Sequence, residues 1–240
     1  MGAEYLLGAL IMTLASFVYG LTGFGIGLVA LSLLPFFMPP VTIVPLVTIY
    51  GAVFALVTTW QLRRDILFPH LRALLVGAVL GTPVGVWILS TCPPSLLRHV
   101  IGAILMSVAV LEWGGLYPRH LIGRRWSLGA GGLAGVLGGA LGTPGPPVIL
   151  YAVAQGWPPR LMKAMLQAFF FVHYSVILTN HWLVGLVTPE VIWLACLYAV
   201  PAAVGLALGD RLFAHINQPQ FRRLLFAMLF VLGVLMHVRG

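Results

Sequence analysis

The chain reads Gly20-Leu-Thr-Gly-Phe-Gly-Ile-Gly27 near the middle of an apolar stretch that runs from residue 4 to residue 37. As a single helix this stretch would be about 50 Å long, whereas the hydrocarbon core of a bilayer is about 30 Å thick. We therefore predict a pair of short helices that meet at a glycine-rich break inside the membrane. Such a break needs protein or a polar cavity around its backbone, so it points to a solute pathway.

The composition is that of a polytopic membrane protein. Hydrophobic residues make up 60% of the 240 residues and charged residues only 8%, against roughly 25% in a soluble domain. The net charge of +8 comes from basic residues in short loops between apolar segments. In this position basic residues orient a membrane protein, so the charge does not indicate nucleic-acid binding. Cys92 and Cys196 lie far apart and outside any metal-binding pattern. We therefore expect no metal, no disulfide and no cofactor.

The sequence also repeats. The motif Gly20-Leu-Thr-Gly23 matches Gly139-Ala-Leu-Gly142 at an offset of 119 residues, and Gly85 is matched to Gly205 at an offset of 120. Each half combines one broken apolar segment with three spans. The predicted first repeat is 1–116, with a hairpin at 4–37 and spans at 41–60, 71–90 and 97–115. A cytoplasmic linker at 117–126 leads to the second repeat, 127–240, with a hairpin at 127–155 and spans at 161–182, 188–208 and 221–238.

The positive charges orient these repeats. If residues 127–155 form a hairpin, eleven basic residues collect on one side of the membrane and only Arg98 and Arg239 on the other. A single crossing would divide them seven to six, without the bias that the positive-inside rule describes. Each half then makes an odd number of net crossings, so the second repeat is inverted. The predicted fold is an all-α polytopic membrane protein of two inverted-topology repeats, as in many secondary transporters.

The second break, Gly138-Gly-Ala-Leu-Gly-Thr-Pro-Gly-Pro-Pro147, interrupts the helix more severely than the first. Its three prolines lack backbone donors and clash with the preceding turn, so no continuous helix passes through. Free amides and the dipole of the helix that restarts there would favour an anion. Close helix packing is the alternative role for glycines. We assign that role to Gly77, Gly81, Gly85, Gly131, Gly135 and Gly139, which are spaced four residues apart.

These motifs resemble the sulfite exporter TauE/SafE family of membrane permeases over about residues 8–238. The resemblance rests on the glycine motif at 20–27, the Pro39-Pro40 turn, a span carrying Thr48, and the repetition of this pattern. It implies transport of sulfur-containing anions such as sulfite, thiosulfate or sulfoacetate across a bacterial inner membrane. Two departures leave open a different anion or coupling. Prolines 144 and 146 replace part of the second glycine cluster, and Gln167 stands at the position that matches Thr48.

Few polar side chains are expected at membrane depth, so each is a candidate for the substrate site. Thr22 and Thr143 flank the breaks, and Tyr174 shares a helix face with Gln167. The predicted substrate-binding residues are Thr22, Gly23, Gly25, Gly27, Thr48, Gly142, Thr143, Pro144, Gly145, Gln167 and Tyr174. His173 is a candidate for proton coupling, with a purely structural histidine as the alternative. Asn180 and His181 end a span and are expected at the membrane interface.

Three functions remain open to the sequence. The first is a secondary transporter with its anion site at the two breaks and alternating access. The second is an anion channel, and the third is a polytopic enzyme acting on a lipid-linked substrate. The enzyme would need clustered His, Asp or Glu, and the five acidic residues lie near segment ends, so we predict no catalytic residues. Expected partners are the anion and the lipid bilayer; a homodimer is left open.

The inverted topology predicts that cysteines placed at Glu4 and Ser127 label from opposite sides of the membrane. The natural cysteines are first replaced, and labelling by an impermeant maleimide is compared in intact and permeabilised cells. Labelling of both positions from the same side would contradict the inversion.

Overall fold

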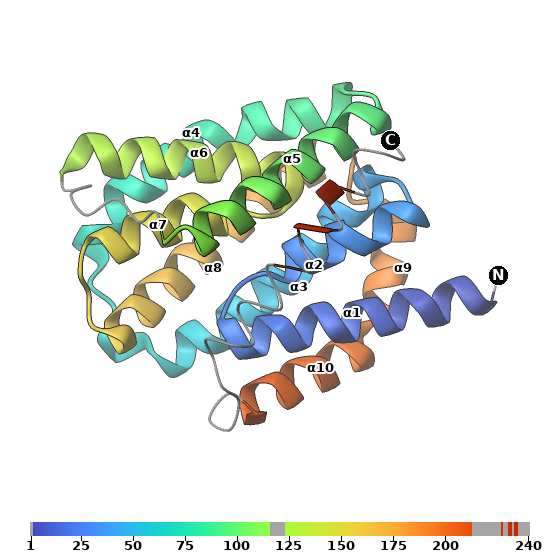
Figure 1. Cartoon of the computed structure of the whole chain (residues 1–240), viewed down its shortest axis with the longest axis horizontal. Coiled ribbons are helices and arrows are strands. Elements are labelled where there is room, and N and C mark those ends of the chain that lie inside the picture. Colours follow the sequence, from blue (N-terminus) through green and yellow to red (C-terminus); the bar gives the residue numbers. More distant parts are fainter. Residues whose placement is uncertain (1, 116–122, 213–226, 228–229, 232, 235–240) are drawn as a thin grey trace. The chain divides into compact units, whose positions relative to one another are not determined.

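A computed structural model of the chain describes residues 2–115 and 123–212, together with residues 227, 230, 231, 233 and 234 (Figure 1). All regular structure in these residues is helical. Most of the predicted span 221–238, and residues 117–122 of the predicted linker, lie outside this part of the chain. The remaining predicted segments each coincide with a helix or with a pair of helices.

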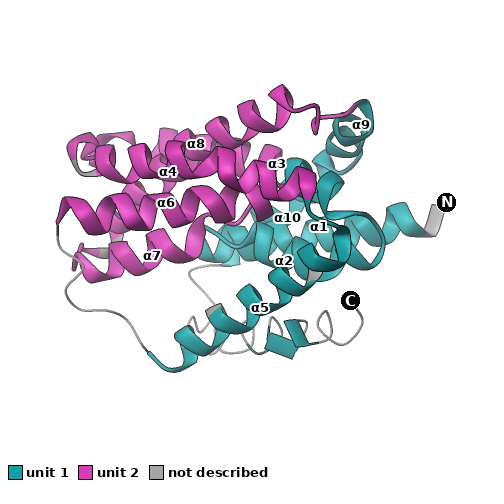
Figure 2. Ribbon diagram, turned by 90° about the horizontal axis from the view of Figure 1, so that it is seen from above, with its two compact units in different colours: residues 1–46, 92–116, 189–240 teal, residues 47–91, 117–188 magenta. Residues whose placement is uncertain are grey.

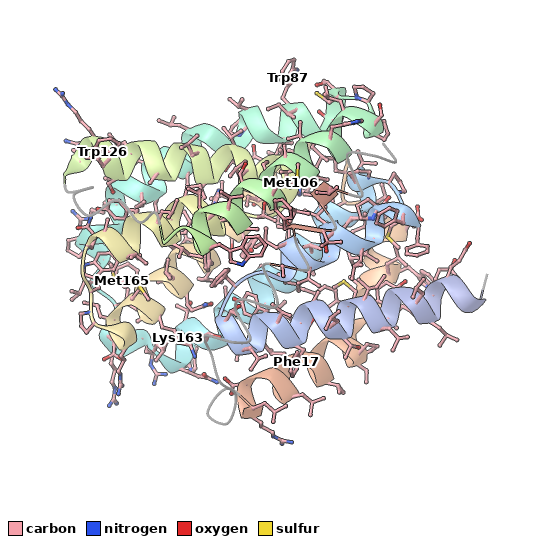
Figure 3. All side chains as sticks on the ribbon, viewed as in Figure 1. Phe17, Trp87, Met106, Trp126, Lys163 and Met165 are labelled. Carbon is pink, nitrogen blue, oxygen red and sulfur yellow. The ribbon has the colours of Figure 1, made fainter. Side chains whose placement is uncertain are left out.

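The described helices confirm a polytopic membrane protein. Five are long and apolar enough to cross a bilayer: Glu4–Thr22, Pro40–Gln61, Leu71–Thr91, Pro94–Leu111 and Arg160–Leu183. They belong to α1 (Gly2–Thr22), α3 (Pro40–Gln61), α4 (Phe68–Thr91), α5 (Pro94–Trp113) and α8 (Pro159–Leu183). Large apolar side chains such as Trp87 and Trp126 are exposed and project outward from their helices (Figure 3), as lipid-facing residues do.

A sixth candidate span is bent. Helices α9 (Pro189–Leu197) and α10 (Ala199–Leu212) meet at Tyr198 with a 50° bend. Pro201 explains the bend, because a proline ring clashes with the carbonyl four residues earlier, here that of Leu197. The sequence predicts a single span at 188–208, without this bend.

Both predicted breaks are present, and both begin at a left-handed glycine. Helix α1 ends at Gly23 (φ 78°), and α6 (Arg124–Leu141) ends at Gly142 (φ 59°). The Gly23 N–H donates to the Tyr19 carbonyl at 2.6 Å, and the Gly142 N–H donates to the Gly138 carbonyl at 2.8 Å. Such bonds satisfy carbonyls that a helix end leaves without partners. The chain restarts as α2 (Ile26–Leu33) after the first break and as α7 (Gly145–Ala154) after the second.

The two arms of the first hairpin differ in length, which corrects the expectation of two short helices. Helix α1 has 21 residues and is long enough to cross the bilayer alone, whereas α2 has 8 and continues into the 3-10 turn η1 (Leu34–Phe36). The inversion of the repeats stays a prediction. Because Ser127 is only 3% exposed, the neighbouring exposed Arg124 is the better labelling site for the topology test.

The chain divides into two compact units (Figure 2). Unit 1 comprises residues 1–46, 92–116 and 189–240, and unit 2 comprises residues 47–91 and 117–188. Each unit takes segments from both halves of the sequence. The long helix pair of unit 1 is α1 with α10, and that of unit 2 is α4 with α6.

The helix pair of unit 2 confirms the predicted glycine packing role. A Cβ on Gly139 of α6 would lie 2.5 Å from the carbonyl oxygen of Thr82 on α4. A Cβ on Gly135 would clash with the Ala78 carbonyl, and one on Gly81 with the Gly132 carbonyl. Only glycine permits this approach, since each residue touches the opposite backbone directly.

Unit 1 repeats these contacts and corrects the register of the sequence match. Gly81 faces the Gly132 carbonyl, and Gly205 faces the Thr13 carbonyl, which lies 119 residues before Gly132. Likewise Gly85 faces Val136, and Gly209 faces the carbonyl of Phe17, labelled between α1 and α10 in Figure 3. Gly205 therefore corresponds to Gly81 at an offset of 124, and matching it to Gly85 was wrong by one turn. Because the glycines recur every four residues, a slip of one turn still aligns glycine with glycine.

The packing predicts that one glycine-to-alanine change on α6 destabilises the protein and that another does not. We expect Gly135→Ala to lower the free energy of unfolding by about 1–3 kcal/mol, because its Cβ meets the α4 backbone. Gly129→Ala is the matched control, because its Cβ would meet nothing within 4 Å. Thermal unfolding in detergent measures both. Equal midpoints for the two variants would contradict the close packing of α4 and α6.

Candidate functional site

The second helix break lies in unit 2, where α6 ends and α7 begins. Both helices pack against α8, and α8 also packs against α4 (Figure 1). The break is therefore surrounded by helices rather than exposed on a single outer face. Its central residues, 140–145, are all buried.

Thr143 is the polar side chain of the break. It stands between the left-handed Gly142 and Pro144, is 6% exposed, and its Oγ1 has no hydrogen-bond partner among the described residues. A buried hydroxyl without a partner is costly, and native proteins seldom leave one unexplained. Thr143 is therefore the residue of this break that is best prepared to bind a polar ligand.

The backbone of the second break offers fewer donors than expected. The first N–H groups of a helix have no acceptor within the helix. Here Pro144 caps α7, and Pro146 and Pro147 occupy its first turn, so Gly145 alone among these residues 144–147 carries an N–H. The sequence therefore predicts more free amides at this break than the structure has. Donors for an anion at this break come from the Gly145 amide and the Thr143 hydroxyl.

A buried hydrogen bond joins α8 to α4 beside the break. Thr82 Oγ1 donates to the Ala78 carbonyl at 2.7 Å and lies 3.0 Å from His173 Nε2. A hydroxyl has one proton, so when that proton goes to the Ala78 carbonyl, His173 Nε2–H is the donor in the second contact. Both side chains are almost fully buried, and His173 Nδ1 has no partner within the described structure.

Because Gly138 has no side chain, this histidine can pack against the break. A Cβ on Gly138 would lie 2.8 Å from His173 Cε1 and 3.3 Å from the Cβ of Pro144. His173 Cε1 thus packs on the last turn of α6, beside Pro144, the residue that follows Thr143. The sequence predicts a role for His173 but none for Thr82, and it places Gly138 in the break without indicating this contact. Their position on the glycine-rich faces of α4 and α6 was the pattern that could have found them.

His181 has a structural role that the sequence did not predict. It is fully buried within the described structure, and its Nε2 lies 3.0 Å from the Gly139 carbonyl. Because a carbonyl only accepts, His181 Nε2–H is the donor. Gly139 lies in the last turn of α6, where carbonyls lose their intrahelical partners. His181 therefore supplies a partner that the break would otherwise remove.

The other predicted residues of unit 2 are also buried. Thr48 lies on α3, and Gln167 and Tyr174 lie on α8. The ring of Tyr174 packs on Gly51 of α3, because a Cβ there would lie 2.7 Å from Tyr174 Cζ. Their contact with a substrate stays a prediction.

In unit 1 the threonine of the first break is already satisfied. The Thr22 hydroxyl contacts the carbonyls of Val18 at 2.9 Å and Phe24 at 2.5 Å, and it accepts the Phe24 N–H at 3.3 Å. Thr22 therefore stabilises its own break. Backbone amides remain, because Gly25 (φ 94°) caps α2 and no proline stands at Ile26 or Gly27. The first break thus offers amides, and the second offers mainly a hydroxyl.

A family model described as Sulfite exporter TauE/SafE matches residues 8–236. The chain belongs to this family. Searches among curated proteins and solved structures gave no match. TauE/SafE membership identifies a multi-pass membrane protein of a transporter family, and it implies movement of sulfur-containing anions such as sulfite across a membrane. It also agrees with the resemblance found in the glycine motifs and their repetition.

The His181 bond predicts a stability effect specific to the donor. We expect His181→Ala to lower the free energy of unfolding of this TauE/SafE protein by about 1–3 kcal/mol, because the Gly139 carbonyl loses its partner. His181→Gln, which retains an N–H donor, should recover part of the loss. Asn180→Ala is the control, because the Asn180 side-chain amide donates to the Val176 carbonyl of its own helix at 2.9 Å. Thermal unfolding in detergent separates these outcomes, and identical midpoints for all three variants would contradict the role of His181.

Proposed function

We propose that the protein is a secondary transporter of a small sulfur-containing anion: sulfite, thiosulfate or an organosulfonate such as sulfoacetate. It works by alternating access in a bacterial inner membrane, with the anion held at the glycine- and proline-rich helix breaks. Family membership supports the transport of sulfur anions. The choice of site and the mechanism are our proposal.

The observation that carries the site is the Thr143 hydroxyl at the second break, which has no hydrogen-bond partner among the described residues. It stands next to the N-terminal end of α7, where the helix dipole favours negative charge. The Gly145 amide adds a second donor. Helices α4, α6, α7 and α8 contain no acidic side chain that would repel an anion. An uncharged site of this kind suits an anion that must also be released.

The first break supports the same chemistry within unit 1. Gly23 and Gly25 have left-handed backbones, and Gly27 is buried in the first turn of α2. The amides from Gly25 to Gly27 precede the first intrahelical bond of α2, from the Val29 N–H to the Gly25 carbonyl. In the proposal these backbone amides donate hydrogen bonds to anion oxygens, and the Thr22 hydroxyl stabilises the conformation of the break.

His173 is the residue at which we expect a proton gradient to act on transport. It packs against the second break and has one ring nitrogen without a partner among the described residues.

A channel with the same breaks is the alternative function, and saturable flux with counterflow distinguishes the transporter from it. A lipid-directed enzyme would instead turn over its substrate.

The proposal predicts that Thr143→Val lowers kcat/KM for anion flux by about tenfold to 100-fold, because a buried donor to the anion is lost. Thr143→Ser should retain most of the activity. The assay is uptake of labelled sulfite, thiosulfate and sulfoacetate into proteoliposomes.

Thr58→Val is the matched control, because the Thr58 hydroxyl bonds to the Phe54 carbonyl of its own helix at 3.0 Å. Unchanged flux in Thr143→Val, with folded protein, would move the site away from the second break. No saturable flux of any of the three anions in folded wild-type protein would contradict the proposed function itself.

A further inference from the structure

Helices α4, α6 and α8 begin at the same end of unit 2. Successive glycines of α4 between residues 77 and 85 face successive carbonyls of α6 between residues 128 and 136, so these two helices run parallel. Helix α8 also begins there, because the Leu67 N–H, just before α4, donates to the Met165 sulfur near the start of α8 at 3.2 Å. The starts of α4, α6 and α8 all lie on the left of Figure 1.

This end also carries the charge of the unit. The basic side chains in the described part of unit 2 all lie in the loop before α4 or in the first turns of the three helices: Arg63, Arg64, Arg72, Arg124, Arg125, Arg160 and Lys163. Asp65 is the one acidic residue in the sequence of 47–91 and 117–188. Each helix start adds the positive end of its dipole. We call the surface formed by these seven basic side chains the basic end.

Contacts hold part of the basic end in a defined arrangement. In the turn η2 (Arg63–Asp65), Asp65 Oδ2 accepts a hydrogen bond from Arg160 Nε at 3.0 Å, which ties this turn to the first turn of α8. Arg63 donates to the Trp60 carbonyl at 2.8 Å, and its guanidinium carbon lies 4.6 Å from the centroid of the Trp60 ring. The Arg160 side chain is 78% exposed despite its ion pair, so it can still reach a partner outside the protein.

The basic end lies where the spans leave the bilayer. The span of α3 ends there, and the spans of α4 and α8 begin there. Three large aromatic side chains at this end are exposed: Trp60, Phe68 and Trp126, of which Trp126 is labelled in Figure 3. Exposed aromatic rings are typical of the membrane interface, at the level of the lipid headgroups. The neighbouring cations therefore lie at the depth of lipid phosphates.

We propose that the basic end of unit 2 is a binding surface for anionic phospholipids. The arginines donate hydrogen bonds to the phosphate oxygens of the headgroup, and the acyl chains lie against the exposed apolar side chains beside Trp60 and Trp126. Seven cations gathered at one end repel each other, and Asp65 compensates only one of them. Anionic headgroups supply the missing negative charge.

This surface differs from a signal that only orients the chain. Basic loops set topology while the protein is inserted, and that role requires no particular lipid around the folded protein. A binding surface makes the stability of the folded protein depend on anionic lipid, because a ligand that binds only the folded state shifts the unfolding equilibrium. The two roles are therefore separated by measurements on purified, folded protein.

The first experiment measures thermal unfolding of the whole purified chain in neutral detergent with added lipid. We expect phosphatidylglycerol, which is anionic, to raise the unfolding midpoint more than zwitterionic phosphatidylcholine at the same mole fraction. The difference should shrink when the salt is raised from about 0.1 M to about 1 M, because exposed charges are then screened. Inorganic phosphate in place of lipid should not reproduce the shift.

The second experiment removes two cations of the basic end. Arg64 and Arg125 are both exposed, so the double variant Arg64→Gln/Arg125→Gln should fold and keep the wild-type midpoint without lipid. We expect it to need at least about fivefold more phosphatidylglycerol for half of the stabilising shift. Arg211→Gln is the matched control, because Arg211 is exposed on α10 in unit 1 and follows Asp210.

The outcomes bear on the lipid surface alone, since none of them depends on which solute is transported. Equal stabilisation by phosphatidylglycerol and phosphatidylcholine would overturn the proposal. An equal shift with inorganic phosphate would replace the lipid by a soluble anion and overturn it as well. If the double variant responded to phosphatidylglycerol as the Arg211→Gln control does, anionic lipid would act elsewhere than at the basic end.

Discussion

The structure depends on how a polypeptide backbone is satisfied where no water can reach it. A helix that stops inside a bilayer leaves carbonyls and amides without partners, and each costs several kcal/mol in hydrocarbon. In the described residues, two helices end at glycine-rich breaks that the sequence predicts to lie inside the bilayer. At both stops a left-handed glycine closes the helix end, and at the second stop a histidine from another helix takes up one of the remaining carbonyls. The breaks are therefore supported by the surrounding structure.

That support requires helices to approach closely, and the glycine faces make this possible. Where α4 and α6 touch, the backbone of one helix lies against the backbone of the other, with no side chain between them. The same contacts recur between α1 and α10. In a membrane, where the lipid is as apolar as leucine, close van der Waals packing of this kind is a main source of helix association. Glycine thus has two roles in this chain: it ends helices at the breaks, and it allows helices to pack closely.

Much of the fold follows from the sequence, because its strongest features are local. The breaks are predictable since the glycines at 20–27 weaken a helix, and the prolines at 144–147 forbid one, within stretches too long to cross once. The bend at Tyr198 is not, because Pro45 and Pro83 also lie within helices, yet α3 and α4 remain continuous. The His173–Thr82 bond joins residues 91 apart in the chain, and no local pattern reveals it. The register of Gly205 was also ambiguous, since a four-residue period aligns equally well after a shift of one turn.

The division of the chain into units has a consequence for how the protein is made. Unit 2 is complete once residue 188 has been synthesised, since its helices come from 47–91 and 117–188. Helix α1, although made first, finds its partner α10 only at residues 199–212. At about 5–20 residues per second, α1 therefore waits roughly ten seconds or more with the face that packs on α10 uncovered. A membrane chaperone or the insertion machinery that shields this face during the interval would protect the nascent chain, and the earliest helix would be the last to reach its final place.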